Sequence, residues 1–245
     1  MYESKKVSLV IGTYKEKSSI KKVIDDYYFS GFIDEIIIVN NNAESGTDDE
    51  VKNTSAFKKK IIKIIYEKRQ GYGYAYKTGI QTATGDYLVI SEADASFKAE
   101  DLEKFLVYAR DFDVVLGTRT SQIGSLSGSS GMGIGRKFAN VIEAKTIEIL
   151  FNSVALTDVG CTYKLFKKDA LKKIIPKWSN SGSALFNTQL VLLTVSSKLK
   201  FVEIPITYSK RIGRSNIVGS WYDEVRWAIV IQVYILIFWL KTRFN

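Results

Sequence analysis

Five short, mainly apolar runs recur in the first half of the chain, and a segment with helical spacing separates each run from the next. The apolar runs are residues 7–12, 35–39, 61–66, 86–91 and 113–117. The segments with helical spacing are residues 17–28, 48–60, 73–84 and 101–110. Such alternation is typical of a parallel sheet buried on both faces. We therefore predict an α/β fold with a mostly parallel sheet flanked by helices, and ligands beyond the carboxyl ends of its strands.

The second half of the chain is less regular. The elements predicted there are a Ser- and Gly-rich loop, two helices and a final strand, at residues 121–135, 137–150, 186–198 and 201–206. Between them, residues 158–165 form a short segment interrupted by glycine. Pro205 indicates that the final strand lies at a sheet edge or ends there. Neither an internal repeat nor a linker divides the chain, so we predict one domain over residues 1–220.

An apolar segment follows that domain, over residues 227–240, and only Gln232 interrupts it. Basic residues flank it, namely Arg226, Lys241 and Arg243. The segment is too short to span a bilayer, so residues 221–245 predict an apolar helix that lies at a membrane interface or packs in a core or between subunits. Residues 1–12 show no signal-peptide pattern, because residues 1–6 are polar and the apolar run over 7–12 is too short for a signal core.

The composition narrows the chemistry. The formal net charge of +9 suits anionic partners, such as phosphorylated ligands or an acidic membrane surface, and no nucleic-acid motif is present. The chain contains no histidine, which excludes His-based triads and His metal ligands. Cys161 is the single cysteine, so no internal disulfide forms. Any proton transfer must therefore use a carboxylate, Lys, Tyr or water.

An acidic pair follows the fourth apolar run. Glu92 and Asp94 lie two positions apart just past a predicted strand end, where a turn brings both carboxylates to one hard cation. Mg²⁺ or Mn²⁺ there would bridge the phosphates of a nucleoside diphosphate and stabilise it as a leaving group. The alternative is a solvated turn in which Asp94 caps the next segment.

Other short patterns surround this pair in a fixed order. Before it come Gly-Thr-Tyr-Lys-Glu at residues 12–16, Val-Asn-Asn-Asn-Ala at 39–43 and Gly-Tyr-Gly-Tyr-Ala at 71–75. After it come Leu-Gly-Thr-Arg at 116–119, the segment at 157–164, Glu-Ile-Pro-Ile at 203–206 and Arg-Ile-Gly-Arg-Ser at 211–215. This ordered set resembles the family 2 glycosyltransferases, which have the GT-A fold, and within them the dolichyl-phosphate mannose synthase-like branch. The resemblance covers residues 7–215.

The resemblance implies a metal-dependent, inverting transfer of a sugar from a UDP- or GDP-sugar. It implies that the nucleotide is bound by Gly12, Thr13, Tyr14, Glu16, Asn40, Asn42, Gly71, Gly73, Lys77, Glu92, Ala93 and Asp94. It implies that Mg²⁺ or Mn²⁺ is bound by Glu92 and Asp94. It implies that the acceptor phosphate is bound by Arg119, Arg136, Arg211 and Ser215. The residues expected to act in catalysis are Asp94, Arg119, Asp158 and Arg211.

The chain departs from the family pattern at several places. Asn40 and Glu92 each stand where the family usually has Asp, and the helix around Gln189 lacks the usual carboxylate. Residues 71–73 read Gly-Tyr-Gly where the family pattern has Gly-Lys-Gly. An amide both donates and accepts hydrogen bonds, so Asn40 predicts an altered base preference. Tyr72, Tyr74 and Tyr76 either stack on a sugar or base or pack against the sheet. Residues 125–135 either close over the donor or form a plain connector.

The acceptor is predicted from a missing carboxylate. Many family members carry a catalytic carboxylate in the helix before the final strand, but residues 186–193 contain none. A phosphate is already an anion and needs no base, whereas a hydroxyl usually does. With the basic charge and the apolar segment, this favours a polyprenyl-phosphate acceptor at the cytoplasmic membrane face. The alternatives are a glycan or other hydroxyl acceptor in cell-envelope polysaccharide synthesis, with Asp158 as base, and a non-catalytic nucleotide-sugar-binding protein. A homo-oligomer is left open.

Overall fold

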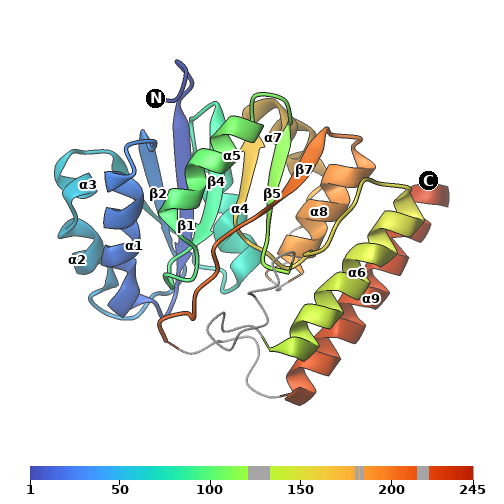
Figure 1. Ribbon diagram of the computed structural model, residues 1–245. Coiled ribbons are helices and arrows are strands. Elements are labelled where there is room, and N and C mark those ends of the chain that lie inside the picture. Colours follow the sequence, from blue (N-terminus) through green and yellow to red (C-terminus); the bar gives the residue numbers. More distant parts are fainter. Residues whose placement is uncertain (121–132, 180–181, 183–184, 214–220, 245) are drawn as a thin grey trace.

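A seven-stranded sheet forms the middle layer of the computed structural model, which describes residues 1–120, 133–179, 182, 185–213 and 221–244 (Figure 1). The strands are β1 (Val7–Thr13), β2 (Glu35–Asn40), β3 (Ile62–Tyr66), β4 (Tyr87–Glu92), β5 (Val114–Thr118), β6 (Lys164–Lys167) and β7 (Phe201–Pro205). Their order in the sheet is β3-β2-β1-β4-β6-β5-β7. Only β6 among these strands runs antiparallel, to β4 and to β5, so the predicted mostly parallel sheet is confirmed.

Helices cover both faces of the sheet. They are α1 (Lys17–Phe29), α2 (Thr47–Lys52), α3 (Ser55–Lys58), α4 (Tyr72–Thr82), α5 (Leu102–Tyr108), α6 (Ile134–Phe151), α7 (Lys168–Ile174), α8 (Phe186–Ser196) and α9 (Trp221–Phe244), with short 3₁₀ turns η1 (Ala99–Asp101) and η3 (Ile175–Lys177). Side chains of α1 and α5 pack on one face, and side chains of α4, α7 and α8 pack on the other. The structure is therefore a three-layer α/β/α arrangement, as predicted.

Successive strand residues feed the two cores alternately. In β1, Leu9 and Ile11 join the core under α1 and α5, whereas Val10 joins the core under α4. All three side chains are fully buried. Each such side chain contributes roughly 1.5–3 kcal/mol when removed from water. This two-sided burial explains why the strands read as continuous apolar runs rather than as an alternating pattern.

The prediction of a single helix over residues 48–60 is wrong. The structure divides this stretch into α2 and α3, with a break at Asn53 and Thr54. The Thr54 side chain accepts a hydrogen bond from the backbone N–H of Phe57 at 3.2 Å and so caps a new helix. Thr is a favoured N-cap residue because its oxygen satisfies a free helical N–H.

The last helix, α9, is longer than the predicted residues 227–240 and lies beside α6 at one edge of the molecule (Figure 1). Gln232 of α9 donates to the Thr146 hydroxyl of α6 at 2.8 Å, and Trp239 donates to the Leu150 carbonyl at 2.8 Å. Within the described part of the chain, residues 222–244 of α9 are by length and composition long and apolar enough to cross a membrane, with a mean hydropathy of 1.5 and only 6% of the apolar window buried. The prediction that this segment is too short to span a bilayer is therefore wrong, because the helix extends beyond residues 227–240 at both ends. The domain boundary at residue 220 stays a prediction.

Candidate active site

A cavity of about 650 Å³ lies at the carboxyl ends of β1 and β4. Gly12 of β1 pairs with Glu92 of β4, so the ends of these parallel strands meet at one edge of the sheet. Nine of the residues predicted to bind the donor, the metal or the acceptor line the cavity, namely Gly12, Thr13, Tyr14, Glu16, Gly71, Glu92, Ala93, Asp94 and Arg211. The N-terminal parts of two later helices also line the cavity, through Asn187 and Thr188 of α8 and Asp223, Arg226 and Trp227 of α9.

One carboxylate oxygen of Asp94 accepts no hydrogen bond. Its side chain is buried, and Oδ1 accepts hydrogen bonds from the N–H and the hydroxyl of Ser96, at 3.0 and 2.6 Å. Oδ2 is buried and accepts no hydrogen bond, although Arg211 Nη2 lies 3.2 Å away. A buried carboxylate oxygen left without a partner is energetically costly. A hard cation satisfies such an oxygen, so Asp94 fits a divalent metal ligand.

Glu92 lies at the end of β4 and is held from one side. Its Oε1 accepts hydrogen bonds from the Tyr72 hydroxyl and from the Thr162 hydroxyl, the latter at 2.6 Å. No described residue donates to Oε2. Burial, and then the nearby Asp94 carboxylate, raise the pKa of Glu92 to about 7. A bound cation would favour the ionised form, so this carboxylate also fits a metal ligand.

Arg211 bridges the acidic side of the cavity. Its Nη2 lies 3.2 Å from Asp94 Oδ2 and 3.9 Å from Glu16 Oε1. The next residue along the chain donates its backbone N–H to the Asp94 carbonyl at 2.9 Å, which ties this segment to the turn after β4. Without a metal, the guanidinium therefore supplies the positive charge beside Asp94.

Glu16 stabilises the turn after β1. Its Oε2 accepts hydrogen bonds from the N–H groups of Tyr14 and Lys15, at 2.7 and 2.9 Å. These two bonds occupy the oxygen that points away from Arg211. Glu16 thus shapes the rim of the cavity, whether or not it contacts a nucleotide.

The sequence did not single out Asn41 as a cavity residue, yet it organises the loop before α4. Its amide donates to the carbonyls of Glu67 and Arg69, at 2.7 and 2.8 Å, and its Oδ1 accepts from Gly71 N–H at 2.9 Å. Gly71 has a φ of +148°, and a Cβ there would lie 2.5 Å from the Gly182 carbonyl oxygen. In the sequence, Asn41 lies between two other asparagines, and nothing there distinguishes its role from theirs.

Four residues predicted to bind the nucleotide do not line the cavity: Asn40, Asn42, Gly73 and Lys77. Asn40 donates to Asp48 at 2.8 Å and accepts from the N–H of Ala43 at 2.9 Å, so both ends of its amide are occupied. Lys77 donates to the Trp178 carbonyl at 2.7 Å. Nucleotide contacts by these four residues stay predictions.

Arg119 and Asp158 form an ion pair with each other. Arg119 Nε and Nη2 donate to the two carboxylate oxygens of Asp158 at 2.8 and 2.9 Å, and its backbone N–H adds a third bond at 3.0 Å. Burial would raise the pKa of Asp158, but the guanidinium outweighs burial and holds this pKa below its usual range. Neither residue lines the cavity, whereas Gly160 beside them does. This pairing argues against the prediction that Asp158 acts as a base.

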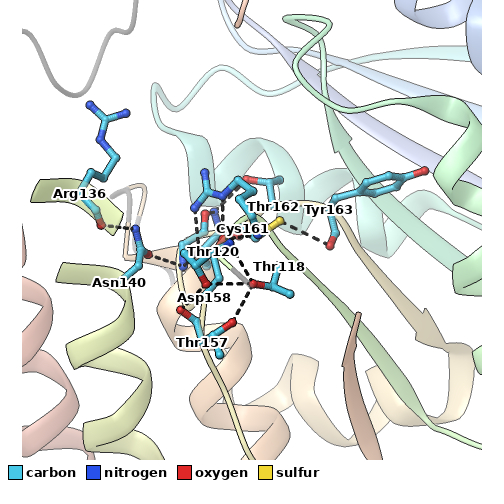
Figure 2. Close-up of polar contacts among 12 residues, drawn as sticks. Thr118, Thr120, Arg136, Asn140, Thr157, Asp158, Cys161, Thr162 and Tyr163 are labelled. Atoms are coloured by element: carbon cyan, nitrogen blue, oxygen red, sulfur yellow. Dashed lines mark hydrogen bonds and ion pairs between the residues drawn. The ribbon is translucent and has the colours of Figure 1, made fainter. Parts of the chain in front are cut away.

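The remaining two predicted phosphate ligands lie elsewhere. Arg136 of α6 donates to Glu224 of α9 at 2.8 Å and does not line the cavity. Figure 2 shows its guanidinium directed away from the contacts around Asp158. Ser215 lies outside the described residues, as does most of the loop over 121–135. Of the four predicted acceptor-phosphate residues, Arg211 is the one that the described structure places in the cavity wall.

Aromatic packing resolves the choice between roles for two tyrosines. Tyr76 is fully buried, and its ring stacks on Phe186 at 4.9 Å between centroids. Tyr74 lies under the Arg69 guanidinium at 4.6 Å. Tyr72 packs edge-on against Phe186 while its hydroxyl reaches Glu92 at the cavity. Packing is therefore the use of Tyr76, and Tyr72 combines packing with a polar contact.

A polar chain behind Glu92 was not predicted from the sequence. Asn187 of α8 donates to the Thr162 hydroxyl at 2.9 Å and accepts from Lys164 Nζ at 3.0 Å. Lys164 is buried, and burial lowers its pKa to about 8. Asn187 and Thr162 lie on segments that meet only in the folded chain, so their contact could not be predicted from the sequence.

The sequence matches the family model described as glycosyl transferase family 2 over residues 8–175. The chain belongs to this family. It is thus a glycosyltransferase domain, and the family predicted from the ordered patterns is confirmed.

Three curated relatives are similar in sequence to this chain, and two of them have names that include undecaprenyl phosphate or dolichyl phosphate. The chain is 24% identical to the undecaprenyl-phosphate mannosyltransferase of Micrococcus luteus, over 93% of this chain and 96% of that protein. It is 25% identical to the dolichyl-phosphate hexose transferase of Haloferax volcanii, over 86% of each chain. It is 23% identical to the low-salt glycan biosynthesis hexosyltransferase Agl6 of the same organism, over 86% of this chain. The chain spans about half, 49%, of the length of Agl6.

Solved structures share the fold. Glucosyl-3-phosphoglycerate synthase from Mycobacterium tuberculosis, in complex with Mn²⁺, uridine diphosphate and glucosyl-3-phosphoglycerate, superimposes with a TM-score of 0.69 at 14% identity, covering 95% of this chain and 79% of that chain. The same enzyme with Mg²⁺ and uridine diphosphate gives a TM-score of 0.66, with the same identity and coverage. The GT-A fold predicted from the sequence is therefore confirmed.

Proposed function

We propose that this chain is a metal-dependent, inverting glycosyltransferase that moves a sugar from a nucleoside diphosphate sugar to a polyprenyl phosphate. The observation that carries this proposal is the buried Oδ2 of Asp94, which accepts no hydrogen bond and lies beside Glu92 and Arg211. These groups line one cavity at the carboxyl edge of the sheet, where ligands of such folds bind. The relatives named for undecaprenyl- and dolichyl-phosphate sugar transfer support the acceptor class.

Asp94 and Glu92 would hold Mg²⁺ or Mn²⁺, which when bound neutralises the charge that develops on a departing diphosphate. No group of three or more Asp, Glu, Cys or His side chains suited to a metal occurs among the described residues. Two carboxylates leave coordination positions that donor phosphate oxygens can fill. The solved neighbours with Mn²⁺ or Mg²⁺ and uridine diphosphate support this choice of metal and donor.

The transfer itself is a single displacement. An acceptor phosphate oxygen attacks the anomeric carbon, and the bond from that carbon to the diphosphate breaks with its electron pair on the diphosphate oxygen. An anionic phosphate needs no base for this step. Arg211 lies 3.2 Å from Asp94 in the cavity wall, where its guanidinium can also bind phosphate oxygens through paired hydrogen bonds.

The surface of α6 and α9 supports a membrane-bound acceptor. On α6, Ile134, Phe138 and Ile142 are 60–65% exposed. On α9, the exposed apolar residues are Val225, Ile229, Val230, Val233, Leu236, Ile237 and Leu240. Such a large exposed apolar area marks a contact with lipid or protein. Because Trp227 of α9 also lines the cavity, a lipid acceptor held by this surface would end near the site. We place the chain at the cytoplasmic face of the membrane, where its positive charge suits anionic lipid.

A second candidate acceptor is a hydroxyl group of a glycan. Asp223 of α9 lines the cavity, and a carboxylate there has the chemistry of a general base. This reading keeps the donor and the metal but replaces the anionic nucleophile with one that must lose a proton.

The function is tested by a donor screen. The purified protein, Mn²⁺ and polyprenyl phosphate are mixed with a panel of UDP- and GDP-sugars, and release of nucleoside diphosphate is recorded. We expect release from one donor, dependent on both the lipid phosphate and Asp94, with Asp94→Asn inactive and the exposed Asp111→Asn active. Release only with a glycan would favour the hydroxyl acceptor. Tight nucleotide binding without release from any donor would favour a non-catalytic binding protein.

A further inference from the structure

Two departures from the family pattern meet at one atom in the cavity. Glu92 replaces the usual Asp, and Tyr72 replaces the Lys of the usual Gly-Lys-Gly. The Tyr72 hydroxyl donates to Glu92 Oε1, and the Thr162 hydroxyl donates to the same oxygen at 2.6 Å. The two hydroxyl oxygens are themselves 3.2 Å apart. Oε1 is thus occupied twice, while Oε2 accepts no hydrogen bond from a described residue.

Contacts with neighbouring side chains fix both donors, Tyr72 and Thr162. The Tyr72 ring packs edge-on between Tyr76 and Phe186, at 4.8 and 4.7 Å between centroids. This packing leaves the hydroxyl little freedom other than toward Glu92.

Thr162 is held through a chain of hydrogen bonds. Its hydroxyl accepts from Asn187 at 2.9 Å, and Asn187 in turn accepts from the buried Lys164 at 3.0 Å. These three residues lie on the 157–163 segment, α8 and β6, so the chain fixes Thr162 against three parts of the fold. Thr162 is 1% exposed, so its hydroxyl lies away from bulk solvent.

A glutamate needs such support more than an aspartate does. Its side chain has one more rotatable bond, and ordering a glutamate in one rotamer opposes binding through lost conformational entropy. Hydrogen bonds that orient a metal-binding carboxylate are worth about 10–100-fold in metal affinity. We propose that Tyr72 and Thr162 are positioning residues that hold Glu92 Oε1, so that Oε2 remains directed at the divalent cation. This inference rests on the proposed metal-dependent function.

The test is the dissociation constant of Mn²⁺ itself, measured by electron paramagnetic resonance without donor or acceptor. We expect Tyr72→Phe, which keeps the ring, to weaken Mn²⁺ binding about 10–100-fold. Thr162→Val should act in the same direction, and Thr162→Ser should restore binding. The matched control is Tyr74→Phe on the same helix, because no described residue accepts a hydrogen bond from that hydroxyl.

A double-mutant cycle separates positioning from a general structural role. An aspartate at position 92 is shorter by one methylene and does not reach the Tyr72 hydroxyl. In the Glu92→Asp background, Tyr72→Phe should therefore change the Mn²⁺ dissociation constant by less than about twofold, because independent sites add and coupled sites do not. An equal loss in both backgrounds would overturn the inference, as would unchanged Mn²⁺ binding in Tyr72→Phe.

The Mn²⁺ measurements also separate failure of the positioning role of Tyr72 and Thr162 from failure of the proposed metal-dependent function. If Mn²⁺ binds the wild-type chain and Asp94→Asn abolishes that binding, the metal site stands, and an effect or lack of effect of Tyr72→Phe decides the inference alone. If the wild-type chain does not bind Mn²⁺ with or without UDP or GDP, both the metal-dependent function and the inference are overturned.

Discussion

Replacing Arg211 with Gln should strengthen the binding of free Mn²⁺ while abolishing sugar transfer. The guanidinium lies 3.2 Å from Asp94 Oδ2, the oxygen that fits a metal, and 3.9 Å from Glu16. A cation that binds Asp94 must therefore displace the positive charge already there or bind beside it. Gln is polar, shorter than Arg and uncharged. The variant therefore removes the cation that competes with Mn²⁺ for Asp94, and it keeps both carboxylates.

The size of the effect follows from the distance and the exposure. Two unit charges 3.2 Å apart attract by about 5 kcal/mol at an effective dielectric constant near 20. The Arg211 side chain is 30% exposed and regains water contacts when it leaves, which offsets much of this attraction. We expect a net gain of about 1–2 kcal/mol, which corresponds to roughly tenfold tighter Mn²⁺ binding.

The assay is a Mn²⁺ titration by electron paramagnetic resonance, with activity measured in parallel. The matched control is Arg226→Gln, because Arg226 lines the same cavity, is exposed and has no ion pair with Asp94 in the described structure. Both variants lose one positive charge, so a gain confined to Arg211→Gln reports the local contact. Unchanged or weaker Mn²⁺ binding in Arg211→Gln would refute the reasoning.

Three further predictions concern stability and the membrane. Asp158→Asn should lower the free energy of unfolding by about 3–5 kcal/mol at pH 7 in urea titrations, since it leaves the Arg119 guanidinium buried without its counter-ion. Because the folded-state pKa of Asp158 is depressed, the higher stability of wild type should be present above about pH 4 and should disappear as the pH falls through that lower pKa. An equal stability of both proteins at pH 7 would contradict this. Burial, and then Asp158, raise the pKa of Glu143 to about 8, so this residue should make wild type lose stability as the pH rises from about 4.5 to 8, by on the order of 1 kcal/mol per pH unit. Glu143→Gln should lack this contribution and lose less stability over that range, although the raised pKa of Glu92 remains in both proteins. Ile142→Glu, at a side chain 60% exposed on α6, should weaken co-sedimentation with anionic vesicles about tenfold or more and leave Mn²⁺ binding unchanged; undiminished vesicle binding would place the membrane contact elsewhere.

The sheet was predictable from the sequence because each strand is buried on both faces. A fully buried strand must be apolar at nearly every position, so polar residues at its end are conspicuous, as are Glu92 at the end of β4 and Asp94 just beyond it. The break between α2 and α3 was harder to predict. It depends on Thr54 capping one helix start, and the same residue is tolerated within a helix of similar composition.

The site was predictable only in part, for a reason visible in Arg119 and Asp158. Each has the chemistry of a catalytic residue, and the family resemblance marks the segments that carry them. Whether an Arg faces a substrate or a neighbouring carboxylate depends on the distance between segments that are far apart in sequence, here 2.8 Å. The same limit applies to Asn187, whose partners come from β6 and the segment before it.

If Asp94 supports transfer of a sugar to a lipid phosphate, a labelled sugar should be recovered on the lipid. A donor labelled in its sugar is incubated with the protein, Mn²⁺ and polyprenyl phosphate, and the organic extract is analysed by mass spectrometry and, for the anomeric configuration, by NMR. We expect a glycosyl polyprenyl phosphate with inverted anomeric configuration from the wild-type chain and from Asp111→Asn, and none from Asp94→Asn. Equal product from Asp94→Asn, or label found only in water-soluble glycan, would contradict this role of Asp94.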